Sequence, residues 1–222
     1  MITTQIKDFE KFLVKELVPG IDDLEKLADA NRKHVQKLVY TNLVDRFDYL
    51  VDNLLLGNCR EEFLVSKAFA QSDQPVKESD LINLLLDSAD LQSAINTKLQ
   101  NKLRLSVLRD RHSRKLYTLL NLCSEVGEFE KKPRVNPSTG EILDSFKIQV
   151  KAVPHSICGY ADWLYSRRNA IVHGAGTSNF LAKDRKQIKK YYGIETTKGF
   201  KIPTSSIRTA VTFYTAVCAK IK

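Results

Sequence analysis

Cysteine and histidine are scarce in this chain, with four of each among its 222 residues. Cys59, Cys123, Cys158 and Cys218 are scattered, form no C-x-x-C pair and have no histidine at ligand spacing. A disulfide framework or a structural zinc site would need such groupings. We therefore expect reduced thiols, most of them packing residues, in a cytoplasmic protein.

Long hydrophobic runs are also absent. Residues 1–7 lack the apolar core of a signal peptide, and the leucine runs 54–56 and 84–86 are far shorter than the roughly 20 apolar residues of a membrane-spanning helix. The chain has no Walker loop, no G-x-G-x-x-G and no G-x-S-x-G. These absences argue against a membrane span, a nucleotide-driven enzyme and a serine hydrolase, and we expect no cofactor.

Positive charge is what the chain has in excess, because 35 Lys and Arg residues face 26 Asp and Glu residues and give a net charge of +9. Such a surplus attracts polyanions, most commonly nucleic acid, with an anionic membrane surface as the main competitor. The basic segments 98–115 and 183–190 are either solvated helix faces or a surface for RNA. The RNA contacts expected from them are Arg109, Arg111, Arg114, Lys189 and Lys190. Tyr191 and Tyr192 follow directly and are either packing residues or platforms for bases.

Hydrophobic residues recur at spacings of three and four along most of the chain, which predicts a mainly α-helical bundle. The expected helices span residues 4–18, 22–57, 61–70, 79–122, 154–173, 183–190 and 205–221. Turn residues between short β-like runs predict small β-hairpin insertions near 128–150 and 192–203. Because no repeat or low-complexity tract divides the chain, we expect one domain over residues 1–222.

The helix expected to start at Pro154 ends with an unusual set of polar residues. On a helical wheel centred on Ile157, Arg168 falls in the middle of the apolar stripe. A charge placed there is costly unless it is paired or faces a cleft. Asn169 and His173 share the opposite flank, together with Asp162. Taken as isolated residues, an arginine paired with a structural carboxylate and a histidine that complements the helix dipole are the commoner explanation of the pattern.

Residues 168–173, R-N-A-I-V-H followed by a glycine, resemble the R-N-x-x-x-H motif of the HEPN superfamily. The resemblance covers roughly residues 154–176, at the end of a late helix as in that family. Within the superfamily, the stretch 39–47 of the long helix resembles the RiboL-PSP type. The resemblance implies a HEPN-like helical bundle and a metal-independent endoribonuclease in which Arg168, Asn169 and His173 are catalytic.

In the mechanism implied by the resemblance, the 2′-OH of RNA attacks the neighbouring phosphate and leaves a 2′,3′-cyclic phosphate and a 5′-OH. A histidine serves as acid or base near neutral pH, and an arginine binds phosphate. Since one chain supplies one such histidine, the resemblance implies a homodimer. The expected protein is a toxin or antiviral defence effector with RNA as substrate and a cognate antitoxin or defence-system protein as partner. The alternative is a non-catalytic helical dimer that binds RNA or nucleotides.

Other polar residues carry weaker expectations. Asp45, Asp48 and Asp52 share one face of the long helix, where an exposed acidic face is a commoner explanation than a metal site. His34 is expected at the surface, and His112, within the basic segment, could touch phosphate. His155 opens the motif helix and lacks a motif of its own.

Overall fold

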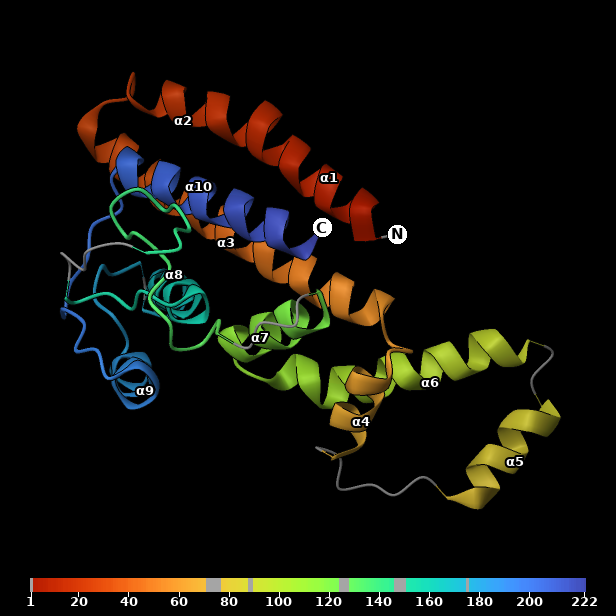
Figure 1. The fold of residues 1–222 in the computed structure, drawn as a ribbon. Helices are drawn as coiled ribbons and strands as arrows, with labels where there is room; N and C mark the ends of the chain where they lie inside the picture. Colours follow the sequence, from red (N-terminus) through yellow and green to blue (C-terminus); the bar gives the residue numbers. More distant parts are fainter. Residues whose placement is uncertain (1, 71–76, 88–89, 124–127, 146–150, 175) are drawn as a thin grey trace.

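The computed structural model describes residues 2–70, 77–87, 90–123, 128–145, 151–174 and 176–222, and these are mainly helical (Figure 1). The helical fold class expected from periodicity is therefore confirmed. Within the described ranges the β pairing is limited to two isolated antiparallel bridges. None of the helices in these ranges combines the length and apolar character needed to cross a membrane.

The N-terminal helical arm is longer than expected. Helix α1 (Ile2–Phe12) continues through a π-helical turn, η1 (Leu13–Leu17), into α2 (Val18–Leu24). The prediction that Pro19 and Gly20 end the first helix is wrong, because Pro19 lies in the first turn of α2, where its missing N–H costs little. The wider π turn just before it changes the spacing of the backbone hydrogen bonds and accommodates the proline.

The long helix α3 (Asp29–Gly57) begins later than expected, because Ala28 has an extended backbone that separates it from α2. This break lets the arm fold back, so that α1 and α2 run alongside α3 and α10 (Thr204–Ile221) in Figure 1. One continuous helix from residue 22 could not bury Ile6 and Phe9 against α3. Both side chains are buried, and the ring of Phe9 lies 5.7 Å from that of Phe47.

The middle of the sequence forms a series of shorter helices. Helix α5, at the lower right of Figure 1, packs on α6. Their bounds are α4 (Glu62–Ala70), α5 (Glu78–Asp87), α6 (Leu91–Leu105), the 3-10 turn η2 (Val107–Arg109) and α7 (His112–Cys123). The basic segment 98–115 is thus not one helix. Asp110 has an extended backbone, and the turn before α7 directs Arg111 and His112 towards α3 and α8.

Neither expected hairpin is confirmed as a regular two-stranded element among the described residues. In 128–150, Val135 and Ile142 make one antiparallel bridge, and residues 146–150 lie outside the described part. The glycine at the tip, Gly140, has φ +81° and abuts helix α10, where a Cβ would come within 2.0 Å of the carbonyl oxygen of Thr209. In 192–203, Gly199 pairs with Asn179 instead of forming a local hairpin. Asn179 precedes α9 (Ala182–Tyr192) and Gly199 follows it, so the bridge joins the segments on either side of this helix.

The core surrounds α8 (Ile157–His173), which packs between α3, α7 and α9. Aromatic rings join the layers: Phe47 of α3 stacks on Tyr214 of α10 at 4.1 Å, and Tyr160 of α8 meets Phe213 of α10 edge-on at 4.9 Å. The hydroxyl of Tyr40 donates to the carbonyl of Leu164 at 2.8 Å and ties α3 to α8. This packing fixes where the last two turns of α8 emerge at the surface.

Candidate active site at the end of helix α8

Both ends of α8 are set by local sequence. The Oγ of Ser156 accepts a hydrogen bond from the N–H of Gly159 at 3.1 Å and caps the first turn. At the other end, the N–H of Gly174 donates to the carbonyl of Ala170 at 2.9 Å. A Cβ at Gly174 would come within 2.3 Å of that carbonyl oxygen, so the glycine is needed for the helix to stop directly after His173.

Arg168 is paired with an acidic residue of α3. Its Nε donates to Oδ1 of Asp45 at 2.6 Å, and its Nη1 donates to Oδ1 of Asn169 at 3.3 Å. The side chains of Arg168 and Asp45 are 19% and 40% exposed, so water reaches the pair. The arginine therefore lies at the edge of the core and points along the surface that α3 and α8 share.

The position of Arg168 on a buried stripe was predicted wrongly, because the buried arginine is its neighbour Arg167, which is 3% exposed. Arg167 donates to the carbonyl of Lys201, and its guanidinium lies 4.5 Å from the ring of Trp163 and 5.1 Å from that of Tyr40. Residues 157–162 are all buried, so α8 has no single apolar stripe at its start. A helical wheel centred on Ile157 therefore predicts the wrong buried face for the C-terminal turns of α8, where Arg167 is buried instead of Arg168.

Asn169 and His173 differ in their surroundings although they lie one turn apart. The Nδ2 of Asn169 is 3.5 Å from Oδ2 of Asp184, a buried carboxylate in the first turn of α9. His173 is exposed in the last turn, beside Val172, which is 44% exposed. Arg168 and Asn169 are therefore in contact, while His173 is exposed at the helix end, where its imidazole can meet a ligand.

Asn169 lines a polar cavity of about 440 Å³ enclosed by α3, α7, α8 and α9. Arg111 donates through Nε to both carboxylate oxygens of Asp162 at 2.7 Å. Asp162, expected on the polar flank with Asn169, is in fact 1% exposed. The charged residues around this cavity are Asp48, Asp52, Asp110, Arg111, His112, Lys115, Asp162, Lys183 and Asp184.

Asp45, Asp48 and Asp52 are only partly exposed, at 40%, 19% and 30%, and each pairs with a cation, so the prediction of an exposed acidic face holds only for the edge at Asp45. Besides the Asp45–Arg168 pair, Asp48 accepts from Nδ1 of His112 at 2.6 Å and Lys115 reaches Asp52 at 2.6 Å. The cause is their spacing of three and four residues, which aligns them with cations that α7 and α8 present. His112, considered as a phosphate contact, is 2% exposed and stacks on Tyr165 at 4.7 Å.

These buried pairs shift several pKa values. Burial opposes ionisation of Asp48, but His112 and Lys115 outweigh it and hold the pKa of this carboxyl well below its usual range. Burial dominates at Asp52 and Asp162, whose pKa values are raised in spite of their cationic partners Lys115 and Arg111. Burial lowers the pKa of Lys115 less than Asp48 and Asp52 raise it, so the net shift is upward.

Three of the five expected RNA-contact residues line one cavity, and the other two lie elsewhere. Arg111, Arg114 and Lys190 line one cavity of about 310 Å³ beside Tyr191. Arg109 is exposed in η2, and Lys189 pairs with Glu195 at 3.3 Å, and neither lines that cavity. Sequence reasoning missed Lys131, which completes the lining, because it lies in the stretch interpreted as a hairpin.

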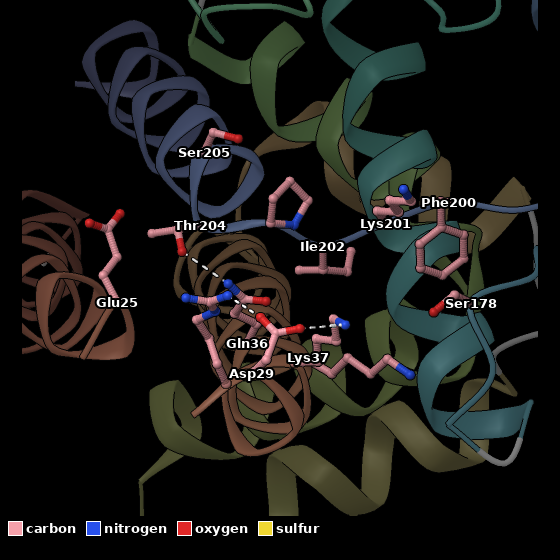
Figure 2. Close-up of a pocket in the computed structure, with 13 residues that line it drawn as sticks. Glu25, Asp29, Gln36, Lys37, Ser178, Phe200, Lys201, Ile202, Thr204 and Ser205 are labelled. Carbon is pink, nitrogen blue, oxygen red and sulfur yellow. Dashed lines mark hydrogen bonds and ion pairs between the residues drawn. The ribbon is translucent and has the colours of Figure 1, made fainter. Parts of the chain in front are cut away.

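A larger groove of about 870 Å³ lies beyond the end of α8 (Figure 2). Lys37 of α3 donates to the carbonyl of Gly176 and so joins this groove to the turn after His173. Figure 2 shows Gln36 directed at Thr204, to which its amide donates at 3.0 Å. No sequence pattern indicates this groove, because its walls come from residues 25–37 and from 178–205, far apart in the chain.

The two remaining histidines lie away from the Arg168–Asn169 contact. His34 is exposed on the first turns of α3, as expected, and His155 is buried before the start of α8. Across the described part of the chain, no three His, Cys, Asp or Glu side chains are grouped as a metal ion would require. No protein-family model, curated protein or solved structure matches the chain.

Proposed function

We propose that the chain is a metal-independent endoribonuclease of the HEPN type, with Arg168, Asn169 and His173 as its catalytic residues. The observation that carries the proposal is their arrangement at the open end of α8. Arg168 and Asn169 are hydrogen-bonded to each other at 3.3 Å, and His173 is exposed one turn further on. The polar residues of the motif that suggested the family thus lie at a helix end where a ligand can reach them, and they are not buried in the core.

The chemistry of RNA cleavage matches these side chains. RNA carries its own nucleophile, the 2′-OH, so the protein has to remove a proton, donate one to the leaving 5′-oxygen and stabilise charge on the phosphate. His173 suits the proton transfers, because an unperturbed imidazole has a pKa of about 6.5. Arg168 suits the phosphate, since a guanidinium offers several donors in one plane. Asp45 then acts as a positioning residue that holds Arg168 through Nε.

The second histidine of such a reaction would come from a second copy of the chain. His112 is buried and occupied by Asp48, so it does not suit the role within one chain. We therefore propose a homodimer in which the last turns of α8 face each other, with exposed Val172 close to the interface. Light scattering at micromolar concentration should report twice the chain mass, and a fully active monomer would contradict the dimer.

A helical RNA- or nucleotide-binding dimer without catalysis is the second candidate. In this candidate the 2.6 Å pair between Arg168 and Asp45 is structural, and the motif takes no part in cleavage. Under the ribonuclease proposal the protein is a toxin or antiviral effector in the cytoplasm, restrained by a cognate antitoxin or defence-system partner.

The two candidates separate in one experiment. Purified protein is incubated with total RNA in EDTA beside the His173→Ala variant, and fragment ends are examined for 2′,3′-cyclic phosphate and 5′-OH. We expect cleavage by the wild type and a loss of about 10²–10⁴-fold in the variant, the usual cost of removing a general acid or base. Little packing is lost at an exposed residue, so the melting temperature should not change. Equal cleavage by both proteins would remove His173 from the mechanism.

A further inference from the structure

Tyr191, at the end of α9, lines two neighbouring cavities. One, of about 310 Å³, is the charged cavity already described beside Arg114 and Lys190. The other, of about 350 Å³, has a largely apolar wall. Both are lined by Tyr191, Tyr192, Glu130 and Lys131, so the two cavities meet along a common edge.

The charged cavity suits a phosphate group. Four cations line it, Arg111, Arg114, Lys131 and Lys190, against one carboxylate, that of Glu130. Glu130 pairs with Arg114 at 2.7 Å and Asp162 pairs with Arg111 at 2.7 Å, so Lys131 and Lys190 carry the excess of positive charge. Phosphate oxygens favour such a set of guanidinium and ammonium donors.

The charged cavity also has rigid parts as well as flexible lysines. Arg111 is held by Asp162, a carboxylate 1% exposed, through two contacts of 2.7 Å at Nε. Ser113 is 5% exposed and lies in the first turn of α7, a helix of 12 residues whose N-terminal dipole favours an anion. Arg111, whose side chain is 17% exposed and is held by a buried carboxylate, and the buried Ser113 therefore form the wall beside the surface lysines.

The second cavity suits a base. Its wall includes Pro133, Pro154 and Ile194, beside the two tyrosines. Tyr191 is 46% exposed, and the guanidinium of Arg114 and the ammonium of Lys190 lie 5.7 Å and 5.8 Å from its ring. A base can stack on an exposed tyrosine ring, and nearby cations strengthen such stacking.

We propose that these adjoining cavities form a nucleotide subsite, with the phosphate among Arg111, Arg114 and Lys190 and the base against Tyr191. A free nucleoside monophosphate and one nucleotide of single-stranded RNA offer the same chemistry. Arg111 also lines the cavity that Asn169 lines, so a strand held here would continue towards the end of α8. The subsite rests on its own residues and does not require that RNA be cleaved.

The test measures equilibrium binding to the purified full chain by titration calorimetry and fluorescence anisotropy. The probes are AMP, UMP, adenosine, which lacks a phosphate, and a labelled single-stranded octanucleotide. The octanucleotide carries 2′-O-methyl groups in place of 2′-OH groups, so it has no nucleophile for cleavage. The variants are Tyr191→Ala, Tyr191→Phe and Lys190→Glu. Lys186→Glu is the matched control, because Lys186 is an exposed lysine of the same helix that lines neither cavity.

We expect Tyr191→Ala and Lys190→Glu each to weaken binding about tenfold, and Tyr191→Phe and Lys186→Glu to change it little. Binding of AMP or UMP, without binding of adenosine, identifies a free nucleotide as the ligand, whereas binding of the octanucleotide alone identifies an RNA strand. The proposal is overturned if no probe binds, if Tyr191→Ala and Lys190→Glu both bind as the wild type, or if Lys186→Glu weakens binding as much as Lys190→Glu. Binding by a wild type that cleaves no RNA would remove the proposed ribonuclease and support the subsite.

Discussion

Arg167 and Arg168 are adjacent in the sequence and lie in opposite environments. Arg167 is 3% exposed, surrounded by the rings of Tyr40, Trp163 and Phe200, and hydrogen-bonded to the backbone. The side chain of Arg168 is 19% exposed and paired with a carboxylate that water reaches. Both cations have partners, but only Arg168 lies where a phosphate could approach. Burial therefore assigns Arg167 to the scaffold and leaves Arg168 available for a ligand.

The acidic residues of α3 repeat this contrast. The side chain of Asp45 is 40% exposed beside Arg168, whereas that of Asp48 is 19% exposed and shared by His112 and Lys115. One turn of helix thus separates a surface pair from an interior cluster. Removing a partner should therefore cost much more inside the cluster than at the edge.

The largest expected loss of stability follows removal of Lys115 from the cluster. Its side chain is 6% exposed and bridges Asp48 and Asp52 at 2.8 Å and 2.6 Å. Lys115→Met keeps the length of the side chain and leaves two carboxylates short of a cation. Breaking buried pairs in this way costs about 3–5 kcal/mol, and we expect the lower end because Asp52 is 30% exposed. Urea denaturation measures the change.

The matched control for Lys115→Met is Lys183→Met, because Lys183 lines the same cavity from α9 and is exposed. An exposed lysine should change the free energy of unfolding by no more than about 0.5 kcal/mol. Similar losses in the two variants would show that the interior cluster contributes no more than the surface.

Arg167→Met should cost less, about 2 kcal/mol. The substitution roughly conserves volume but removes the cation–π contacts with three rings and the hydrogen bond to the carbonyl of Lys201. No carboxylate is left behind, because the partners of Arg167 are rings and a backbone oxygen. If Arg167→Met unfolds no more easily than the wild type, the contrast between the two arginines has no energetic basis.

The pH dependence of unfolding should also report the cluster, with an effect of about 1–2 kcal/mol. The pKa of Asp48 is lowered in the folded protein, so its contribution is present above the unfolded value of about 4 and is lost as the pH falls through the folded pKa. Asp162, whose pKa is raised mainly by burial, acts in the opposite direction. Asp48→Asn should therefore lose less stability than the wild type between about pH 4 and pH 2. A steeper loss in the variant would contradict this assignment.

Helix type and approximate extent could be predicted from periodicity, whereas the breaks could not. The glycine stop fixed the end of α8, and burial of Phe9, Leu13 and Leu17 followed from their spacing. The predicted helix end at Pro19 was wrong, because a π turn before Pro19 accommodates its ring within the helical arm. The separation of α2 from α3 depends on packing of the N-terminal arm against α3, which has no local signal.

At the site, the sequence placed Asn169 and His173 on the same side of the helix but misjudged which arginine is buried. Burial of Arg167 depends on Tyr40 and Phe200, each more than 30 positions away in the chain. The exposure of the acidic residues of α3 was also mispredicted. The cations that face Asp48 and Asp52 belong to α7, which is distant in the sequence. Local patterns state which residues share a face, and tertiary contacts decide what that face meets.

The smallest expected change in stability belongs to Arg168, and it is the one that decides its role. Because the Asp45–Arg168 pair is partly exposed, Arg168→Ala should cost no more than about 1 kcal/mol while EDTA-resistant cleavage falls about 10²-fold. Arg168→Lys keeps the charge opposite Asp45 but loses the planar set of donors, so cleavage should remain impaired at an unchanged melting temperature. Asp45→Asn is the control that leaves Arg168 in place and removes its ionic partner. A loss of 3 kcal/mol or more in Arg168→Ala, as expected for a buried pair, together with full activity in Arg168→Lys, would make Arg168 a structural residue like Arg167.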